Sequence, residues 1–309
     1  MLRRPQRRLL ALLAAGVVVL TTPAGAWAQA GPHGPAAAVG VGGAAATVDA
    51  LATAAAVDTL RHGGNAVDAA VTAAAVLGVT EPFSCGIGGG GFMVVYRARS
   101  GKVTTIDGRE RAPVGMKPDS FWENGEPLAF SAARFSGLSV GVPGTVRTWD
   151  EALRRYGTIS LGAALRPAIH VARAGFVVDQ PFFDQTQGNV DYFDDIASSR
   201  ALYLKPDGTP YPVGTTFRNP DLARTYERIA RRGPEGFYRG AVAKAVVETV
   251  QHPPVLPGAN HTWRAGLMTL RDLRTYDALQ RPPTRVSYRG LDVYGMGPPS
   301  SGGSTVGEA

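Results

Sequence analysis

Four consecutive glycines, residues 88–91, lie in the stretch SCGIGGGGFMVVY, which runs from residue 84 to residue 96. Within it, Gly86, Gly88 and Gly91 match the G-x-G-x-x-G spacing of a dinucleotide-binding loop. Such a loop follows a strand and opens a helix, whose N-terminus faces the pyrophosphate. Here a small-residue helical segment precedes the glycines and the β-rich FMVVY follows them. This order argues against nucleotide binding. It leaves open tight packing of a helix on a strand, or a loop that lines a pocket.

Other residues that could do chemistry are isolated in the sequence. Cys85 is the only cysteine, so no internal disulfide forms, and its apolar, glycine-rich surroundings predict a small packed residue rather than a nucleophile. Ser300 and Ser301 lie in a Pro/Gly turn without a G-x-S-x-G elbow, which predicts a turn and helix entry. Four histidines lack metal-ligand spacing: His62, His170, His252 and His261. We therefore expect neither a metal nor another cofactor.

The N-terminus has the pattern of an export signal. Residues 1–8 carry four arginines and no acid, residues 9–20 are apolar, and small residues surround Ala28. This pattern predicts a signal peptide over 1–28 that is cleaved after Ala28, and hence a secreted or periplasmic protein. A membrane anchor is the alternative, but a spanning helix needs about 20 apolar residues. The arginine pair Arg3–Arg4 matches a twin-arginine signal only weakly.

Composition excludes some partners. The chain has 309 residues, 44% of them hydrophobic, which is enough for a substantial core. Loss of the four arginines of the signal lowers the formal net charge from +7 to +3. No Lys/Arg run with interleaved aromatic residues occurs, so we expect no nucleic-acid partner, and no membrane partner after signal cleavage. The chain is interpreted as one α/β domain over 44–309, preceded by a flexible leader over 29–43.

The glycine run should lie between two well-marked elements. An alanine-dense helix is expected over 44–60, with Gly63 as a left-handed C-cap. Asn65 can cap a second helix over 66–79, which is nearly all small or apolar and should be buried. Asp68 on this helix is expected to be buried and hydrogen-bonded to the nearby glycine loop. After the glycines, β-rich runs on either side of RSGK, residues 99–102, predict a hairpin.

The rest of the chain alternates helical and turn-rich segments. A turn at Pro143 should lead into a helix that ends near Tyr156, and the next helical stretch, 161–176, should break at Pro167. Residues 182–220 are turn-rich. Further on we expect two helices within 219–251, a short helix entered through Thr269, and a pair of strands within 283–299.

The C-terminal residues carry a helix-start signal. Thr305 stands three residues before Glu308, as in a capping box, and the sequence stops one residue later. A helix that begins there would have no body, so the sequence is expected to be cut short.

Several blocks together resemble one family. They are RHGGNAVDAAVTAAAVLGVTEPFSCGIGGGGFMVVY, IDGRERAP, VGVPGTVRTWDEALRRYG, NPDLARTYERIARRGPEGFYRG and PPSSGG. In this order they resemble the large subunit of the γ-glutamyltranspeptidases, from about residue 38 to the end. The resemblance implies an N-terminal-nucleophile hydrolase with an αββα sandwich. It also implies a precursor that cuts itself, so that a small subunit begins with the nucleophilic Thr.

The resemblance further implies an activity. That Thr attacks the γ-amide of glutathione or another γ-glutamyl compound, its own α-amine can serve as the base, and the γ-glutamyl group passes to water or an acceptor amine. A Thr-Thr-His motif announces the nucleophile in the family. None occurs in these 309 residues, where the Thr-Thr pairs are followed by Pro23, Ile106 and Phe217. The nucleophile is thus expected downstream of Ala309, and the chain is expected to lack its small subunit and to be inactive alone.

One functional residue carries over by the resemblance. Arg109 in DGRERAP matches the arginine that binds the α-carboxylate of the γ-glutamyl group, and a guanidinium suits a carboxylate in shape and charge. The alternatives are an ion pair with Glu110 or Asp107, or a solvated strand end. The neighbouring Arg111 is interpreted as a surface residue. A secreted protein that binds γ-glutamyl compounds or glutathione through Arg109 without catalysis stays open as the second function.

Overall fold

The structure is a computed structural model that describes residues 39–309, so the predicted signal peptide lies outside the described residues. Its elements in chain order are α1 (Ala50–Arg61), α2 (Ala66–Thr80), β1 (Gly91–Arg97), β2 (Lys102–Gly108), β3 (Trp122–Glu123), β4 (Glu126–Pro127), α3 (Phe130–Arg134), η1 (Gly137–Ser139), α4 (Thr145–Tyr156), α5 (Leu161–Ala174), β5 (Phe176–Val177), α6 (Gln180–Gln187), α7 (Val190–Asp195), α8 (Ala197–Tyr203), β6 (Thr216–Phe217), α9 (Pro220–Arg232), α10 (Glu235–Tyr238), α11 (Gly240–Gln251), α12 (Leu270–Thr275), β7 (Leu279–Arg281), β8 (Thr284–Tyr288), β9 (Leu291–Gly295) and α13 (Gly302–Glu308).

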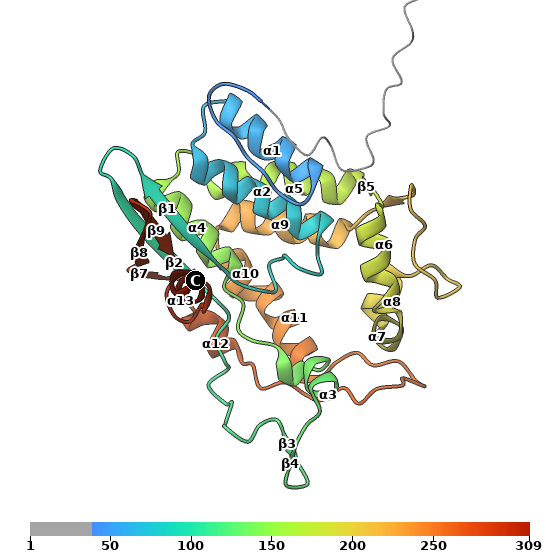
Figure 1. Ribbon diagram of the computed structural model, residues 1–309. Coiled ribbons are helices and arrows are strands. Elements are labelled where there is room, and N and C mark those ends of the chain that lie inside the picture. The colour runs from blue at the N-terminus through green and yellow to red at the C-terminus, as the bar shows by residue number, and fades with distance from the viewer. Residues whose placement is uncertain (1–38) are drawn as a thin grey trace, which may run out of the picture.

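The small-residue helix α2 lies at the centre of a helical layer. It packs against α1 and α5, and α5 packs in turn against α9 (Figure 1). Asn65 caps α2 with its side chain and Gly63 takes a positive φ of 89°, as predicted. Small side chains let neighbouring backbones approach closely: a Cβ on Gly78 would stand 3.3 Å from the Cα of Gly86. The composition of α2 therefore sets how near the glycine loop can lie.

A three-stranded antiparallel sheet stands beside this layer, in the order β1-β2-β7. β1 and β2 form the predicted hairpin, in a register that places Gly91 opposite Gly108. Helix α4 packs against both strands. Among the described strands, none pairs with the other edge of β1, where Val94 and Tyr96 are exposed. That edge offers unpaired backbone groups to another strand.

The chain's last elements form a second, separate hairpin. β8 and β9 pair around Arg289 and Gly290, whose φ angles of 49° and 80° suit the tight turns of two-residue hairpins. Helix α13 packs against both strands. The strands expected within 283–299 are thus confirmed, as is the Thr269-capped α12. The two helices expected within 219–251 are α9 and α11, and the short helix α10 lies between them, where only a linker was expected.

Two helix predictions in the first half of the chain are wrong. The first helix begins at Ala50 rather than at residue 44, because the Asp49 side chain accepts the Ala52 N–H and starts the helix there. Helix α5 runs through Pro167 without a break. Its neighbours Ala164, Leu165 and Ala168 are fully buried, and this packing offsets the hydrogen bond that proline cannot donate.

Two further predictions fail in the second half. The turn-rich stretch 182–220 contains the helices α6, α7 and α8, whose aromatic residues pack together: Phe182 lies 6.5 Å and Phe193 4.7 Å from Tyr203 between ring centroids. Thr305 does not start a helix. Helix α13 already begins at Gly302, with Ser301 at the N-cap position, so Thr305 lies inside it.

Asp68 is buried as predicted, but its partners differ from the prediction. Its carboxylate accepts the backbone N–H of Asn65 and of Ile159, and both the backbone N–H and the hydroxyl of Thr158. The glycine loop is not among these partners. Asp68 instead joins the start of α2 to the turn before α5, about 90 residues away, a link that local sequence does not reveal.

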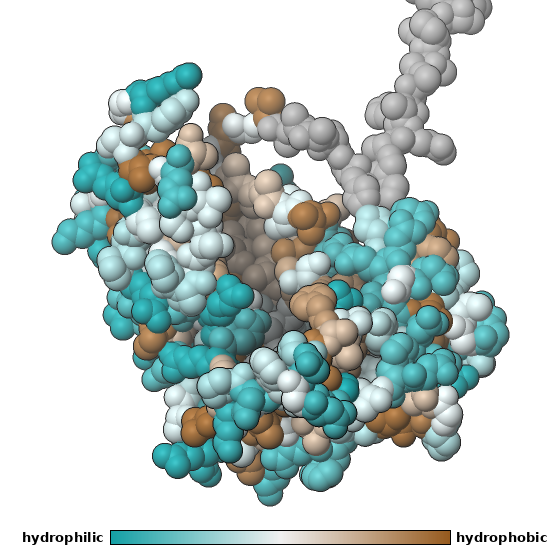
Figure 2. All heavy atoms as spheres, turned by 60° about the horizontal axis from the view of Figure 1, so that its bottom comes forward, coloured by the Kyte–Doolittle hydropathy of each residue, from teal (hydrophilic) through white to brown (hydrophobic). Residues whose placement is uncertain are grey.

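One face of the molecule is hollowed. Figure 2 shows a hollow with apolar residues in it, flanked by polar side chains. Along residues 39–309, no helix is both long enough and apolar enough to cross a bilayer.

Candidate functional site

Arg109 follows directly after β2, at the end of the central hairpin. Its backbone N–H donates to Asp107 Oδ1 at 3.1 Å, and its carbonyl accepts from the Tyr276 hydroxyl at 2.7 Å. The guanidinium carbon lies 6.0 Å from the centre of the Phe92 ring on β1. The residue is exposed. Its backbone is therefore held on both sides while its side chain reaches solvent.

Arg109 forms an ion pair with neither Asp107 nor Glu110, the two partners that the sequence offered. Asp107 is buried and binds Arg281, whose Nε donates to Oδ2 at 2.6 Å. Within residues 39–309 no carboxylate lies within 4.0 Å of the Arg109 guanidinium. Arg111 is exposed, as predicted, but engaged: it donates to the Asp277 carbonyl and lies 4.9 Å over the Tyr276 ring. Of these two arginines, Arg109 is the one whose charge is available to an anion.

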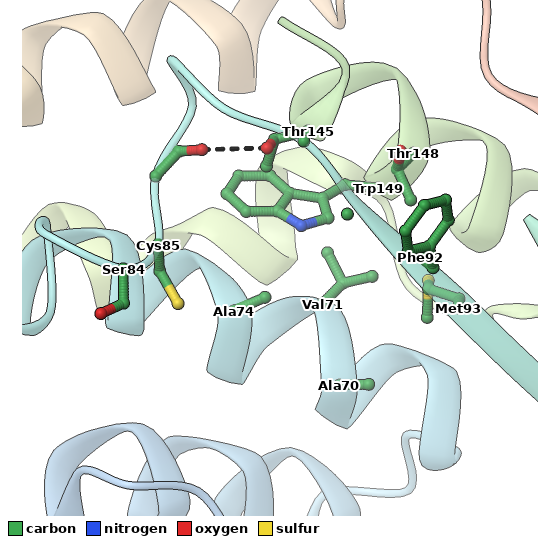
Figure 3. A pocket seen from close by; sticks show the side chains of 13 residues that line it. Ala70, Val71, Ala74, Ser84, Cys85, Phe92, Met93, Thr145, Thr148 and Trp149 are labelled. Atoms are coloured by element: carbon green, nitrogen blue, oxygen red, sulfur yellow. Dashed lines mark hydrogen bonds between the residues drawn. The ribbon is translucent and has the colours of Figure 1, made fainter. Parts of the chain in front are cut away.

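A cavity of about 340 Å³ lies beside this arginine. α2, the glycine loop, the start of β1 and the start of α4 surround it (Figure 3). Its walls are mainly apolar, with Val71, Phe92, Met93 and Trp149 among them. Arg109 does not line the cavity, but Phe92 borders both. The arrangement can hold an apolar body next to an exposed cation.

The glycine loop is tied to the start of α4. The carbonyl of Gly89 accepts the N–H groups of Gly144 and Thr145, at 2.8 and 3.1 Å, and the Thr145 hydroxyl donates to the Gly86 carbonyl at 2.9 Å (Figure 3). Gly86, Gly90 and Gly91 line the cavity. The loop follows helix α2 and precedes strand β1, the reverse of a dinucleotide loop. Both interpretations of the glycine run that the sequence left open are correct: the loop is tightly packed, and it lines a pocket.

Gly90 is the glycine of the run that the packing requires most strictly. A Cβ there would lie 2.4 Å from the Gly108 carbonyl oxygen and 2.9 Å from the Glu110 nitrogen, both of them backbone atoms that cannot move aside. We expect Gly90→Ala to lower the free energy of unfolding by about 2 kcal/mol or more, since overpacking forces a backbone shift. Urea denaturation measures this.

Gly88→Ala is the matched control, because nothing lies within 4 Å of its Cβ position. It should change stability by less than about 1 kcal/mol. Equal losses in the two variants would contradict the close approach of the loop to the end of β2.

Cys85 borders the cavity and is partly buried. Its sulfur points toward Ala74 of α2 in Figure 3. Burial, and then the nearby Glu81 carboxylate, raise the pKa of the thiol. A nucleophilic cysteine needs the opposite shift. These contacts favour the interpretation of Cys85 as a small packed residue.

The remaining candidates are not brought together. Ser300 lies in the turn before α13 and Ser301 at its N-cap position, as predicted. His261 binds the buried Asp195 at 2.8 Å, while His62 and His252 pair with carboxylates on their own helices. In the part of the chain that is described, no group of three or more His, Cys, Asp or Glu residues could hold a metal ion.

Two residues of the site escaped the sequence reasoning. Tyr276 holds the Arg109 carbonyl from 167 residues away, and nothing in the surrounding RTYDAL marks it. Thr145 holds the glycine loop, and its signal was local: it follows the turn VPG directly. A hydroxyl at the first position of a helix can reach a neighbouring loop.

Comparisons with known proteins agree with one another. The family model described as "Gamma-glutamyltranspeptidase" matches residues 52–308. The glutathione hydrolase proenzymes of Bacillus subtilis strain 168 and Escherichia coli K12 are 40% and 38% identical over 247 and 246 residues, which make up 79% of this chain and 40% of each relative. The crystal structure of Helicobacter pylori γ-glutamyltranspeptidase matches with a TM-score of 0.80 and 32% identity, covering 88% of this chain and 74% of that one.

These matches confirm the predicted fold class, a mixed α/β fold of the N-terminal-nucleophile hydrolase type. The chain spans about 40% of the length of the curated relatives that it matches.

Proposed function

The chain belongs to the γ-glutamyltranspeptidase family, and we propose that it supplies the large-subunit portion of a γ-glutamyltransferase and glutathione hydrolase. The observation that carries the proposal is the continuous match over residues 52–308, which includes the DGRERAP segment. The substrate is a γ-glutamyl amide such as glutathione. The acceptor is water, an amino acid or a peptide.

Arg109 binds the α-carboxylate of the γ-glutamyl group. Its guanidinium has no carboxylate partner among residues 39–309. A planar guanidinium donates two parallel hydrogen bonds to a carboxylate, which fixes both the position and the orientation of the ligand. Because the backbone N–H and the carbonyl of Arg109 are both hydrogen-bonded, the side chain leaves the backbone in a defined direction.

The chemical step needs a nucleophile that these 309 residues do not supply. We place it in a small subunit derived from the same precursor, as the N-terminal Thr. Its hydroxyl oxygen bonds to the γ-carbonyl carbon and its proton passes to the α-amine; the C–N bond then breaks as the leaving amine takes a proton. Water or an acceptor amine attacks the resulting ester and releases the Thr. Arg109 holds the substrate during both steps.

The small subunit docks on the free edge of β1. That edge is unpaired within the described strands, its Val94 and Tyr96 are exposed, and the cavity between α2 and Trp149 opens beside it. Strand addition would satisfy the backbone groups and cover this apolar surface. The domain comprises residues 44–309 and follows an export signal over 1–28 and a leader over 29–43. The export signal places the enzyme outside the cytoplasm.

The complete gene product tests the proposal: the protein expressed from its locus with any reading frame that follows codon 309. We expect a precursor that splits into two chains on a denaturing gel and releases p-nitroaniline from γ-glutamyl-p-nitroanilide. Binding of glutathione without turnover would instead support the non-catalytic alternative. A protein that neither turns over γ-glutamyl-p-nitroanilide nor binds glutathione would overturn the proposed function.

A further inference from the structure

Residues 272–281, which we name the clasp, hold residues 107–114, the DGRERAP segment and the valine after it, at four points. The Tyr276 hydroxyl donates to the Arg109 carbonyl. The other three contacts join Asp272 Oδ1 to the Val114 N–H at 3.0 Å, the Asp277 carbonyl to Arg111 Nη2 at 2.8 Å, and Arg281 Nε to Asp107 Oδ2 at 2.6 Å. Strand β7, at the end of the clasp, also pairs with β2. A distant segment thus fixes the arginine's backbone from both sides.

Tyr276 is the centre of this arrangement. It is buried, and its ring is parallel to that of Tyr238, with 6.0 Å between the centroids. The guanidinium carbons of Arg111 and Arg147 each lie 4.9 Å from the centroid of one of the two rings, those of Tyr276 and Tyr238 respectively. The stacked pair of tyrosines and the guanidinium group over each ring restrain the orientation of both ring planes.

The two tyrosine hydroxyls hold the two backbone turns of the site. Tyr238 donates to the Pro143 carbonyl at 2.8 Å, next to Gly144, which closely approaches Gly108. Tyr276 donates to Arg109 itself. Burial is the main cause that raises the pKa of Tyr276 to about 12, so its hydroxyl remains a donor at neutral pH.

From these contacts we propose that Tyr276 is a positioning residue for Arg109, and that it sets the selectivity of the site for substrates with an α-carboxylate. This rests on the proposed function. The Arg109 N–H is tied to Asp107 and its carbonyl to Tyr276, so the direction in which the side chain leaves the backbone is fixed. Loss of the Tyr276 hydroxyl removes the hydrogen bond to the Arg109 carbonyl and leaves the stacked tyrosine rings in place.

Tyr276→Phe in the complete gene product is the test. We expect KM for γ-glutamyl-p-nitroanilide to rise about fivefold, the effect of one lost hydrogen bond, with kcat changed by less than about twofold. The second substrate is 4-aminobutanoyl-p-nitroanilide, which lacks only the α-carboxylate. For it, kcat/KM should be the same in Tyr276→Phe and the native protein. A merely structural role of Tyr276 would reduce turnover of both substrates alike.

Tyr211→Phe is the matched control, since within the described residues the Tyr211 hydroxyl makes no hydrogen bond and its ring packs on Phe217. It should leave both substrates unaffected. Arg109→Ala separates the two proposals. If Arg109→Ala loses the preference for the α-carboxylate and Tyr276→Phe keeps it, the positioning role is wrong and the proposed function stands. If neither variant changes the preference, the roles of Tyr276 and Arg109 are both wrong, while the activity stands. If the native protein turns over neither substrate, the proposed function is wrong as well.

Discussion

Replacing Arg109 with alanine in the complete gene product is expected to lower kcat/KM for γ-glutamyl-p-nitroanilide by about two to three orders of magnitude. The loss follows from the geometry, because within residues 39–309 no carboxylate pairs with the Arg109 guanidinium, which leaves its charge available to the substrate. Arg111, the nearest cation in the sequence, is occupied by Asp277 and Tyr276. Steady-state hydrolysis assays measure the ratio.

Two further variants sharpen this prediction. Arg109→Lys keeps the charge but loses the planar fork, so its kcat/KM should fall between those of the native protein and Arg109→Ala. Arg99→Ala, in the exposed turn of the same hairpin, is the matched control and should be within about twofold of native. A loss below about fivefold in Arg109→Ala, with the protein folded, would show that the substrate carboxylate is held elsewhere.

Predictions from the sequence succeeded where the physical cause is local. Asn65 begins α2 because its side chain reaches the N–H groups of Val67 and Asp68, both within three residues. The β1–β2 hairpin follows from two β-rich runs and a short turn whose Gly101 takes a positive φ. The glycine run was correctly placed between a helix and a strand, since composition alone marks both flanks.

Predictions failed where distant segments decide. Pro167 predicts a break, yet burial of its neighbours against α2 and α9 keeps α5 continuous. The start of the first helix depends on one cap, Asp49, within a run of residues that all favour helix. Tyr276 illustrates the limit most clearly: its role exists only because β7 pairs with β2 and brings residue 276 next to residue 109. No local pattern encodes such a contact.

The site therefore depends on links between distant parts of the helical layer as well as on the arginine. Asp68 is one of these links, because its fully buried carboxylate accepts four hydrogen bonds. Its partners Thr158 and Ile159 belong to the turn that leads into α5. Removing the carboxylate would take the hydrogen-bond acceptor away from the start of α2 and from the turn before α5 at once.

We expect Asp68→Ala to lower the free energy of unfolding by about 3 kcal/mol, because the charge-assisted hydrogen bonds to a buried carboxylate are all lost together. Urea denaturation at pH 7 measures this. Asp58→Ala is the matched control: Asp58 lies on the exposed face of α1, where its carboxylate is 3.3 Å from His62, and its loss should change stability by less than about 0.5 kcal/mol. Similar losses in the two variants would contradict a linking role for Asp68.

The effect of Asp68 should also depend on pH, with a definite sign. Burial alone would raise the pKa of this carboxyl, but the hydrogen bonds from Thr158, Asn65 and Ile159 together outweigh burial and lower the pKa below its ordinary 3.8. A group with a lowered folded-state pKa stabilises fully above its unfolded-state pKa and loses that contribution as the pH falls through the folded-state value. The stability difference between the native protein and Asp68→Ala should thus be constant from pH 7 to about pH 5 and shrink in stronger acid. A difference that grows toward acid pH would mean that burial, not hydrogen bonding, dominates at Asp68.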